Sequence, residues 1–560
     1  MAKRVAITIA GAVSLGSYEA GVLYELLNAF DTWNRQPDSD ESKKIYIDVL
    51  TGASAGAMTA AMVAQRLMYD ADALGDQAAQ SEPTNSLYAA WVKRISLLGL
   101  AKMGLKEPKW HSLFSSKLIE DIGHQMLIAN TKKSEGKRHS TVQPGQPLRV
   151  GFALTNMNGI DYTIPIVGND DGGFNYTTSA DQKCFVITGD ATEDAKSWEV
   201  FCKAAVASGA FPAAFRAQEI AHTVSEYDTP PVPEKPQVPL PGVSYLDWPK
   251  PGHPVPFCHC DGGVLQNQPL GIAKNLADDA TAALSTDGSF HDSSDRLYVF
   301  VSPHSVKSTA KKLNANKLTI LAEMKHLVSV YMRQAMFHDW ITAEEMNRKI
   351  TVLDERANQL ADVIKQGFVS VPELTKAASD LNALLMPTDE NDRLARLRIQ
   401  YGMQYEDILG VSGKPAAAAY IAALATLEAA AHLQDRDKMK IVAVIASESE
   451  LAGAGLAAFV GFFRKSYRQH DYWVGRTKTR KYLQRGDVRK ILEIDEWPAE
   501  LNLGTAVPNP SGLEKPPGFF SIATAAIIPG LIFLGVRWIS WVLLAVMGAL
   551  IWGVFKLLHS

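Results

Sequence analysis

The sequence is poor in cysteine and nearly balanced in charge. Four of its 560 residues are cysteines, too few for the disulfide framework that stabilises small secreted proteins. The formal net charge of -4 gives no electrostatic basis for binding nucleic acid, so we expect no nucleic-acid partner. Apolar residues make up 47% of the chain and charged residues 21%, which is typical of a globular protein with a large core. At this length we expect about two or three structural units.

A cleavable signal peptide is not expected at the amino terminus. The first residues, MAKRVAITIAGAVSLG, are basic and then apolar, as they are in a signal peptide. However, the apolar stretch is short and interrupted by glycine, and no convincing cleavage site follows it. We therefore interpret residues 5–10 as a buried first strand and expect the amino-terminal domain to lie in the cytoplasm.

The carboxyl terminus holds the longest apolar segment of the sequence. Residues 519–555 contain a single charged side chain, that of Arg537. The stretches Phe519–Val536 and Trp538–Phe555 hold 18 residues each, close to the shortest length that spans a bilayer. We therefore expect a membrane anchor over residues 518–556.

Two arrangements of this anchor are compatible with the sequence. In a helical hairpin, which we favour, Arg537 lies at the far membrane interface with Trp538 and Trp541 beside it. In a single longer span from Leu531 to Phe555, Arg537 would lie within the hydrocarbon at a considerable cost in free energy. A buried hairpin in a soluble protein is a third reading, which the length of the segment disfavours.

Short apolar runs alternate with helical patterns over the first 305 residues, which predicts a layered α/β domain over residues 1–305. Within it, the proline-rich stretch 229–256 reads as an extended surface excursion. Residues 306–507 are mainly helical in pattern, so we expect an appended or cap region there. Residues 508–517 read as a linker into the anchor. The runs with strand character are 5–10, 45–50, 148–154, 183–188 and 296–302.

The most informative motif is Gly52-Ala53-Ser54-Ala55-Gly56. It follows an apolar run and precedes small residues with a helical pattern. A Gly-x-Ser-x-Gly turn between a strand and a helix lifts the serine hydroxyl out of the backbone, which is typical of a nucleophile. The amino terminus of the following helix favours developing negative charge. We therefore predict Ser54 as a nucleophile, with Gly52 and Gly56 letting the strand and the helix approach closely.

Nucleophilic catalysis also needs a base and hydrogen-bond donors for the oxyanion. Asp261 precedes Gly262 and Gly263, so its carboxylate can project from a loop and be oriented by glycine amides. The turn after the first predicted strand, residues 11–23, contains glycines and offers backbone amides for an oxyanion. A fourth segment, residues 207–215, is rich in small residues and suited to packing beside Ser54.

In this order, the four segments resemble the patatin-like phospholipase family, whose members carry a Ser–Asp dyad in a doubly wound α/β fold. The resemblance covers roughly residues 4–305 and implies Ser54 as the nucleophile and Asp261 as the base that accepts its proton. It also implies that backbone amides stabilise the oxyanion, namely those of Gly11, Ala12, Val13 and Ala55.

Two further segments are similar to parts of the same family. The family pattern A-S-x-x-x-P-x-x-F matches Ala207, Ser208, Pro212 and Phe215. Residues 468–476, RQHDYWVGR, are similar to a late segment of larger bacterial members, although this match is less specific. We expect the late segment to be a structural charge cluster.

The first glycine loop departs from the family pattern. The pattern G-G-G-x-[RK]-G is replaced by G-A-V-S-L-G, in which Gly11 and Gly16 hold their places and Leu15 stands where a basic residue is common. Ala12 and Val13 resist a positive φ. Backbone amides do the oxyanion work, and larger bacterial members show a similar variant, so we expect activity to survive. A catalytically degenerate relative is the alternative.

The run Cys258-His259-Cys260 has the composition of a metal site but not its geometry. On a strand, residues 258 and 260 face away from residue 259, and no second cluster accompanies them in the sequence. A Ser–His–Asp triad is also disfavoured, because the histidine of an α/β-hydrolase follows the acid in the chain. We therefore expect no metal and no cofactor.

These observations predict a phospholipase A type of lipid acyl hydrolase that acts through an acyl-serine intermediate. The predicted anchor makes membrane phospholipid the expected substrate and the bilayer the expected partner. We expect the inner membrane of a bacterium, with the catalytic domain in the cytoplasm. The alternatives are a membrane-tethered scaffold without activity and a serine esterase or thioesterase with a soluble substrate. A homo-oligomer is left open.

Overall fold

The protein is described by a computed structural model, and contacts between residues divide it into two compact units. The first contains Met1–Ala280, Leu297–Asp339 and Ile441–Ser560, and the second contains Thr281–Arg296 and Trp340–Lys440. The expected anchor beyond residue 518 and most of the proline-rich stretch lie outside the described residues. The structure describes residues 2–37, 40–69, 78–80, 85–104, 112–129, 138–164, 174–189, 191–223, 226–227, 253–285, 296–303, 320–385, 394–395, 397–398, 400–431, 439–454 and 458–518.

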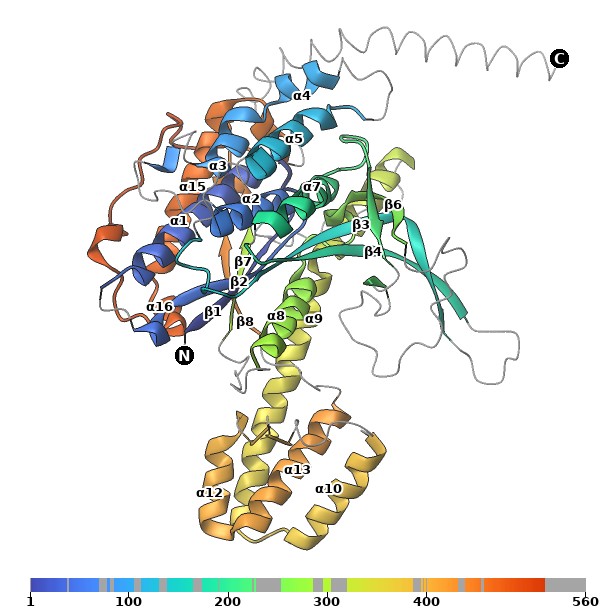
Figure 1. The fold of residues 1–560 in the computed structure, drawn as a ribbon, viewed down its shortest axis with the longest axis vertical. Helices are drawn as coiled ribbons and strands as arrows, with labels where there is room; N and C mark the ends of the chain where they lie inside the picture. The colour runs from blue at the N-terminus through green and yellow to red at the C-terminus, as the bar shows by residue number, and fades with distance from the viewer. Residues whose placement is uncertain are drawn as a thin grey trace, which may run out of the picture. The chain divides into compact units, whose positions relative to one another are not determined.

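The first unit is built on an eight-stranded mixed sheet (Figure 1). Its order is β5-β6-β3-β2-β1-β7-β8, and β4 also pairs with β3. The pairs β1–β2, β1–β7 and β2–β3 are parallel, whereas β3–β4, β3–β6 and β5–β6 are antiparallel. The strands are β1 (Lys3–Ile9), β2 (Ile45–Gly52), β3 (Leu148–Ile164), β4 (Phe174–Ile187), β5 (Gln218–His222), β6 (Val255–Asp261), β7 (Leu297–Ser302) and β8 (Lys440–Ile445).

Helices cover both faces of this sheet, with α1, α2, α7 and α15 on one side and α8 on the other (Figure 1). Strand β3 illustrates the two faces, because the ring of Phe152 lies 5.0 Å from that of Phe201 on α7, while the neighbouring Gly151 faces Ile272 on α8. The longer helices of the unit are α1 (Gly16–Asn34), α2 (Ala55–Tyr69), α4 (Leu97–Gly104), α5 (Ser116–Gly123), α7 (Ala191–Ser208), α8 (Leu270–Ser285), α15 (Lys465–Leu483) and α16 (Gly486–Leu492).

Two of the central strands, β2 and β7, are buried along their whole length, because helices pack on both faces of the sheet. Every residue of β2 and β7 is buried, which explains why their sequences are continuous apolar runs rather than alternating ones. The predicted strands at residues 5–10, 45–50, 148–154, 183–188 and 296–302 correspond to β1, β2, β3, β4 and β7. The layered α/β fold expected from the sequence is therefore confirmed.

Helix α15 packs against α1 although their sequences lie far apart. Arg476 and Arg480 of α15 both pair with Glu25 of α1, with Arg476 Nη2 2.5 Å and Arg480 Nε 3.2 Å from its carboxylate oxygens. All three side chains are buried. The expected single appended region, residues 306–507, is thus divided: residues from 441 onward belong to the first unit and residues 340–440 to the second.

The second unit is helical. It contains the later part of α9 (Ile320–Lys365), α10 (Val371–Leu385), α12 (Gly402–Ser412) and α13 (Lys414–Ala430). Its core is formed by alanine, larger aliphatic and aromatic side chains, among them Ala357, Leu424 and Tyr420, which are fully buried. Alanines at these positions allow the helices to pack closely.

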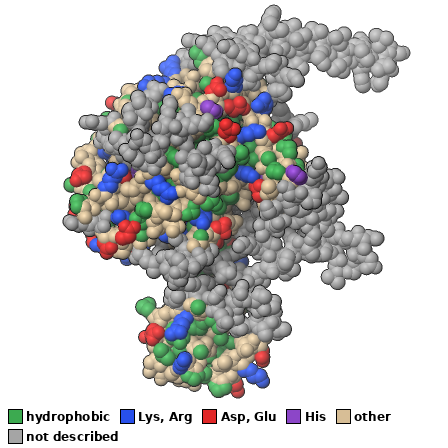
Figure 2. Space-filling view, viewed as in Figure 1, with side chains coloured by type: hydrophobic (Ala, Val, Ile, Leu, Met, Phe, Trp, Pro, Cys, Tyr) green, Lys and Arg blue, Asp and Glu red, His purple; other side chains and the backbone are tan. Residues whose placement is uncertain are grey.

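The described surface carries charges of both signs. Figure 2 shows Lys and Arg side chains interspersed with Asp and Glu side chains on the face that it draws. Within the described ranges, we find no helix that combines the length and the apolar character needed to cross a bilayer. The predicted anchor lies outside these ranges and stays a prediction.

Candidate active site

Ser54 lies at a sharp turn between β2 and α2. Its φ is +54°, a left-handed conformation that is uncommon for a residue with a side chain. The turn is possible because Gly52 ends the strand and Gly56 lies in the first turn of the helix. A Cβ atom on Gly56 would lie 2.4 Å from the carbonyl oxygen of Ile9 on the neighbouring strand. The helix can therefore approach β1 this closely only because residue 56 is a glycine.

Asp261 lies within hydrogen-bond distance of Ser54. The serine Oγ donates to Asp261 Oδ2 at 2.6 Å, and both side chains are buried. Asp261 is the last residue of β6, where it pairs with Leu154 of β3. Strand pairing therefore brings together two residues that are far apart in the sequence.

The backbone around Asp261 fixes its carboxylate. Its other oxygen, Oδ1, accepts a hydrogen bond from the amide of Gly263 at 2.7 Å. Its carbonyl oxygen accepts one from Thr155 Oγ1 at 2.9 Å. A Cβ atom on Gly262 would lie 2.0 Å from the carbonyl oxygen of Ala153, so this loop passes directly over β3. The side chain is thus held in one orientation from both sides.

Burial makes Asp261 a weaker acid than an exposed aspartate. Desolvation raises its pKa to about 7, although the hydrogen bonds from Ser54 and Gly263 act in the opposite direction. A carboxylate with this pKa is a stronger base than usual and is close to half-ionised at neutral pH. The pair Ser54–Asp261 can therefore transfer a proton from the hydroxyl to the carboxylate.

Ser208 locks the turn that carries Ser54. Its hydroxyl accepts a hydrogen bond from the amide of Ser54 at 2.9 Å and donates one to the carbonyl oxygen of Ala153 at 2.7 Å. Ser208 is fully buried at the end of α7. The segment 207–215 thus packs beside Ser54, as the sequence predicted, and links it to β3.

The first glycine loop lies beside Ser54 and presents backbone amides. Ala12, Val13 and Ala55 are described, and among the described residues their amides have no hydrogen-bond acceptor. Val13 has a φ of +51°, which is strained for a β-branched residue. Val13, Ser54 and Ala55 line the same pocket. These amides are therefore available to an oxyanion formed at Ser54.

Gly11 differs from its neighbours in this loop. Its amide already donates to the carbonyl oxygen of Asn267 at 3.0 Å, so a part in holding an oxyanion would require this bond to break. A Cβ atom on Gly11 would lie 2.1 Å from Asn267 Oδ1 and 3.1 Å from the Cβ of Ser54. In the structure, the glycine makes room beside Ser54, and its predicted role as a donor stays a prediction.

Two further positions of the altered loop serve packing. Leu15 is fully buried, so the position at which the family often carries a cation is part of the core. Gly16 begins α1 and faces the indole ring of Trp91, which lies within 2.6 Å of the place a Cβ atom would take. The loop therefore keeps its shape through apolar contacts.

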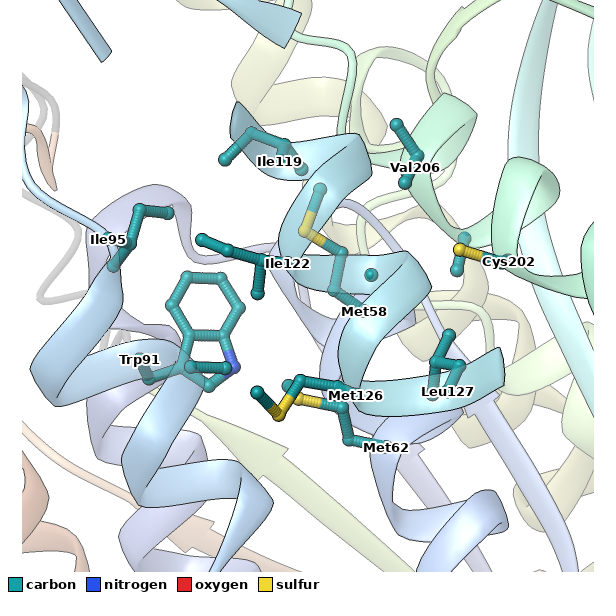
Figure 3. Close-up of a pocket in the computed structure, with 13 residues that line it drawn as sticks. Met58, Met62, Trp91, Ile95, Ile119, Ile122, Met126, Leu127, Cys202 and Val206 are labelled. Carbon is teal, nitrogen blue, oxygen red and sulfur yellow. The ribbon is translucent and has the colours of Figure 1, made fainter. Parts of the chain in front are cut away.

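Two adjoining apolar pockets open next to Ser54. The one that contains Ser54 has a volume of about 360 Å³, and the second has about 450 Å³. They share Met58, Trp91, Ile95 and Ile119. In Figure 3, side chains of α2, α5 and α7 surround the second pocket, which Met62, Met126, Leu127, Cys202 and Val206 also line.

The late segment 468–476 holds the helical layer on the core. The buried Arg468 donates to the carbonyl oxygens of Val92 and Gly461, and Asp471 accepts from the amides of Ala452 and Gly453. Desolvation raises the pKa of Asp471 to about 8. His470 Nε2 lies 3.1 Å from the carbonyl oxygen of Glu450. These contacts support the structural role expected for this segment.

Sequence reasoning missed two residues of the site. Asn267 shapes the glycine loop, and the sequence signal for it is its place six residues after Asp261 in the run DGGVLQNQP, residues 261–269. Phe462 lines the Ser54 pocket from a short helix, Val460–Phe462, more than 400 positions along the chain. No motif surrounds Phe462, so its place in the Ser54 pocket is known only from the structure.

Comparison with known proteins identifies the family of the first unit. Residues 7–274 match the family model described as Patatin-like phospholipase. This part of the chain belongs to the patatin-like phospholipase family, which confirms the resemblance. The uncharacterized protein y4iI of Sinorhizobium fredii is 26% identical, in a match that covers 48% of this chain and 45% of the relative. The chain thus spans less than half the length of that curated relative.

Proposed function

We propose that this chain, whose residues 7–274 belong to the patatin-like phospholipase family, is a lipid acyl hydrolase of phospholipase A type. One observation carries the proposal: the hydroxyl of Ser54 donates to the buried carboxylate of Asp261 at 2.6 Å, at the wall of an apolar pocket. A nucleophile with its base beside an apolar cavity suits an ester of a fatty acid.

The reaction is an acyl transfer in two steps. Ser54 Oγ attacks the ester carbonyl carbon while its proton passes to Asp261 Oδ2, and the C–O bond to the alcohol breaks as Asp261 returns the proton to that oxygen. Water then attacks the acyl-serine, again losing a proton to Asp261, and the fatty acid leaves as Ser54 regains its proton. The amides of Ala12, Val13 and Ala55, which have no acceptor in the described part of the chain, are suited to stabilise the oxyanion in both steps.

The two apolar pockets support a long acyl chain as the group transferred. Most of the side chains that line them are apolar, chiefly those of methionine, isoleucine, phenylalanine, leucine and valine, and such walls favour a hydrocarbon chain over a hydrophilic acyl group. Met58 and Trp91 border both pockets, so a chain bound at Ser54 can extend past them into the larger one.

We also propose that the chain is attached to a bacterial inner membrane through residues 518–556, with its catalytic domain in the cytoplasm. The apolar length of residues 519–555 supports this, and attachment would hold the site at a high effective concentration near phospholipid. Full-length protein should stay with membranes in an alkaline wash, whereas protein ending at residue 518 should be released. Equal release of both proteins would contradict the anchor.

The central test measures fatty-acid release from phospholipid vesicles by the full-length protein and by Ser54→Ala and Asp261→Asn. We expect release by the unaltered protein and a loss of at least about 1,000-fold in both variants. Ser17→Ala, which alters a buried serine of α1, is the control. Labelling of Ser54 by a fluorophosphonate without lipid release would favour a soluble ester as substrate. Absence of both would favour an inactive scaffold.

A further inference from the structure

Three buried side chains outside the Ser54 site converge on one point. Asp181 of β4, His222 of β5 and His259 of β6 each offer an atom that can bind a metal ion, and these atoms lie within 4.8 Å of one another. The side chain of Asp181 is 3% exposed and those of both histidines are 0% exposed. The mechanism proposed for Ser54 and Asp261 uses none of the three.

The contacts of His259 cannot both be hydrogen bonds if its imidazole ring is neutral. Nδ1 lies 3.0 Å from the carbonyl oxygen of Phe257, so it carries a proton and donates to that oxygen. In the neutral ring, Nε2 is then an unprotonated acceptor, yet it lies 3.0 Å from Asp181 Oδ2. Two acceptors at this distance repel each other unless a proton or a cation lies between them.

His222 repeats this pattern. Its Nδ1 lies 3.1 Å from Glu226 Oε2, at charge-pair distance but poorly aligned for a hydrogen bond. Its Nε2 lies 3.9 Å from Asp181 Oδ2 and finds no hydrogen-bond partner among the described residues. A fully buried imidazole with an unpartnered nitrogen costs free energy, which a ligand at that nitrogen would recover.

Both histidines therefore have Nδ1 beside an oxygen and direct Nε2 at the same carboxylate. Metal-bound histidines usually show this arrangement, because an oxygen at Nδ1 fixes the tautomer and leaves Nε2 for the metal. Asp181 is itself oriented by donors: Tyr227 Oη at 2.8 Å and Asn156 Nδ2 at 3.2 Å to Oδ2, and the amide of Gln182 at 2.7 Å to Oδ1.

The distances from Asp181 to the two histidines are close to those around a small tetrahedral ion. Zinc binds nitrogen and oxygen ligands at about 2.0–2.1 Å, which sets tetrahedral ligand atoms about 3.3 Å apart. The two measured separations from Asp181 Oδ2, 3.0 Å to His259 and 3.9 Å to His222, lie on either side of this value. Two imidazoles and one carboxylate are also a donor set that zinc accepts.

We propose that Asp181, His222 and His259 form a binding site for a divalent transition-metal ion of the zinc class, with a fourth position left to water. The ion would join β4, β5 and β6, the last of which ends at Asp261, two residues after His259. Its expected role is to fasten these antiparallel strands and so to stabilise the fold around the site.

The test is a titration of full-length, chelator-treated protein with Co²⁺, followed by visible absorption spectroscopy and displacement with Zn²⁺. We expect one equivalent of Co²⁺ to give the d–d absorption of a four-coordinate site. His222→Gln and His259→Gln should each weaken binding by at least about 100-fold, and Glu226→Gln, which alters the partner of His222, by about 10–100-fold. Zinc should also raise the thermal unfolding midpoint of the unaltered protein but not that of His222→Gln.

His139→Gln is the matched control. His139 is also fully buried and lies 3.8 Å from an aspartate, Asp31, but it belongs to no such cluster of three in the described part of the chain. It should keep full Co²⁺ binding. The proposal is overturned if the unaltered protein binds neither Co²⁺ nor Zn²⁺ at micromolar concentration, because His259 then pairs with Asp181 as a protonated imidazole. Sulfur-to-cobalt charge-transfer bands would equally overturn it, by locating the metal at a cysteine.

Discussion

Ser54 Oγ and Asp261 Oδ2 lie 2.6 Å apart in a region where water reaches neither side chain freely. The contact joins the turn after β2 to the end of β6, and each end is held by hydrogen bonds from its own surroundings, through Ser208 for Ser54 and Gly263 for Asp261. A change that weakens either hydrogen bond should therefore shift Ser54 or Asp261 and lower the reaction rate.

The first prediction concerns pH. Desolvation raises the pKa of Asp261 to about 7, and the base must be ionised to accept the proton of Ser54. We expect kcat/KM to fall about tenfold per pH unit below pH 7 and to level off above about pH 8. Measurement on a micellar ester between pH 5 and 9 checks this, and a flat profile would mean that Asp261 is ionised throughout.

The same raised pKa has a consequence for stability. The folded state binds the Asp261 proton more tightly than the unfolded chain, so this contribution to stability is fully present below the unfolded pKa, near 4, and is lost as pH rises toward 7. Between about pH 4 and pH 7, the unfolding free energy of the unaltered protein should therefore fall relative to that of Asp261→Asn.

The second prediction concerns Ser208. Ser208→Ala leaves the amide of Ser54 and the carbonyl of Ala153 without their buried partner. We expect a loss of about 1–3 kcal/mol in stability and about 10–100-fold in kcat, since the turn holding the nucleophile is released. Ser17→Ala removes one longer hydrogen bond, to Ser14 O at 3.3 Å, and should leave kcat unchanged. Equal kcat values in both variants would contradict this role.

A third prediction compares two glycines. Gly56→Ala brings a methyl group to within 2.4 Å of a backbone oxygen of β1 and should cost at least about 3 kcal/mol, with loss of fluorophosphonate labelling. Gly410 lies in α12 with open space around its Cβ position, so Gly410→Ala should stabilise the second unit by up to about 1 kcal/mol. Urea unfolding measures both changes.

The fourth prediction tests the acyl pocket. Val206 lines the larger pocket from α7, whereas Val200 on the same helix is 43% exposed. Val206→Trp should fill part of the pocket and lower kcat/KM for a palmitoyl ester by at least about tenfold while sparing a butyryl ester. Val200→Trp should change neither. An equal loss on both esters in Val206→Trp would indicate general disruption instead of a shortened pocket.

The fifth prediction concerns the attachment of α15. Glu25→Gln leaves Arg476 and Arg480 without the buried carboxylate that they share and should destabilise the first unit by about 3–5 kcal/mol. Glu41→Gln removes a surface pair with Lys44, in which the glutamate side chain is 61% exposed, and should cost less than about 1 kcal/mol. Similar losses of stability in the two variants would contradict the prediction that the buried ion pairs of Glu25 stabilise the fold more than the exposed pair of Glu41.

Local sequence patterns predicted the parts of this fold that local chemistry determines. The turn at Ser54 needs glycine on both sides, and the loop at Asp261 needs glycine to pass over β3, so both could be read from composition and spacing. The strands β1, β2 and β7 were visible because strands buried on both faces are continuous apolar runs.

Contacts between distant segments could not be predicted in this way. The pairing of Glu25 with Arg476 depends on how α15 lies against α1, and charged residues carry no periodic signal of such a partner. The grouping of Asp181, His222 and His259 arises from strand register, because the three residues lie on three different strands and neither Asp181 nor His222 belongs to a recognisable motif in the sequence. The sequence argument against a metal weighed His259 with its adjacent cysteines, which strand alternation separates from it.

The position of α15 also bears on how the protein is made. A ribosome delivers β1, β2 and Ser54 first, yet the helix that covers α1 and the loop that supplies Phe462 follow more than 400 residues later. Until then, the apolar face of α1 has no partner from α15 and the Ser54 pocket lacks one wall. Nascent chains should therefore depend on chaperones for most of their synthesis, and the pocket is completed only shortly before the last apolar segment emerges.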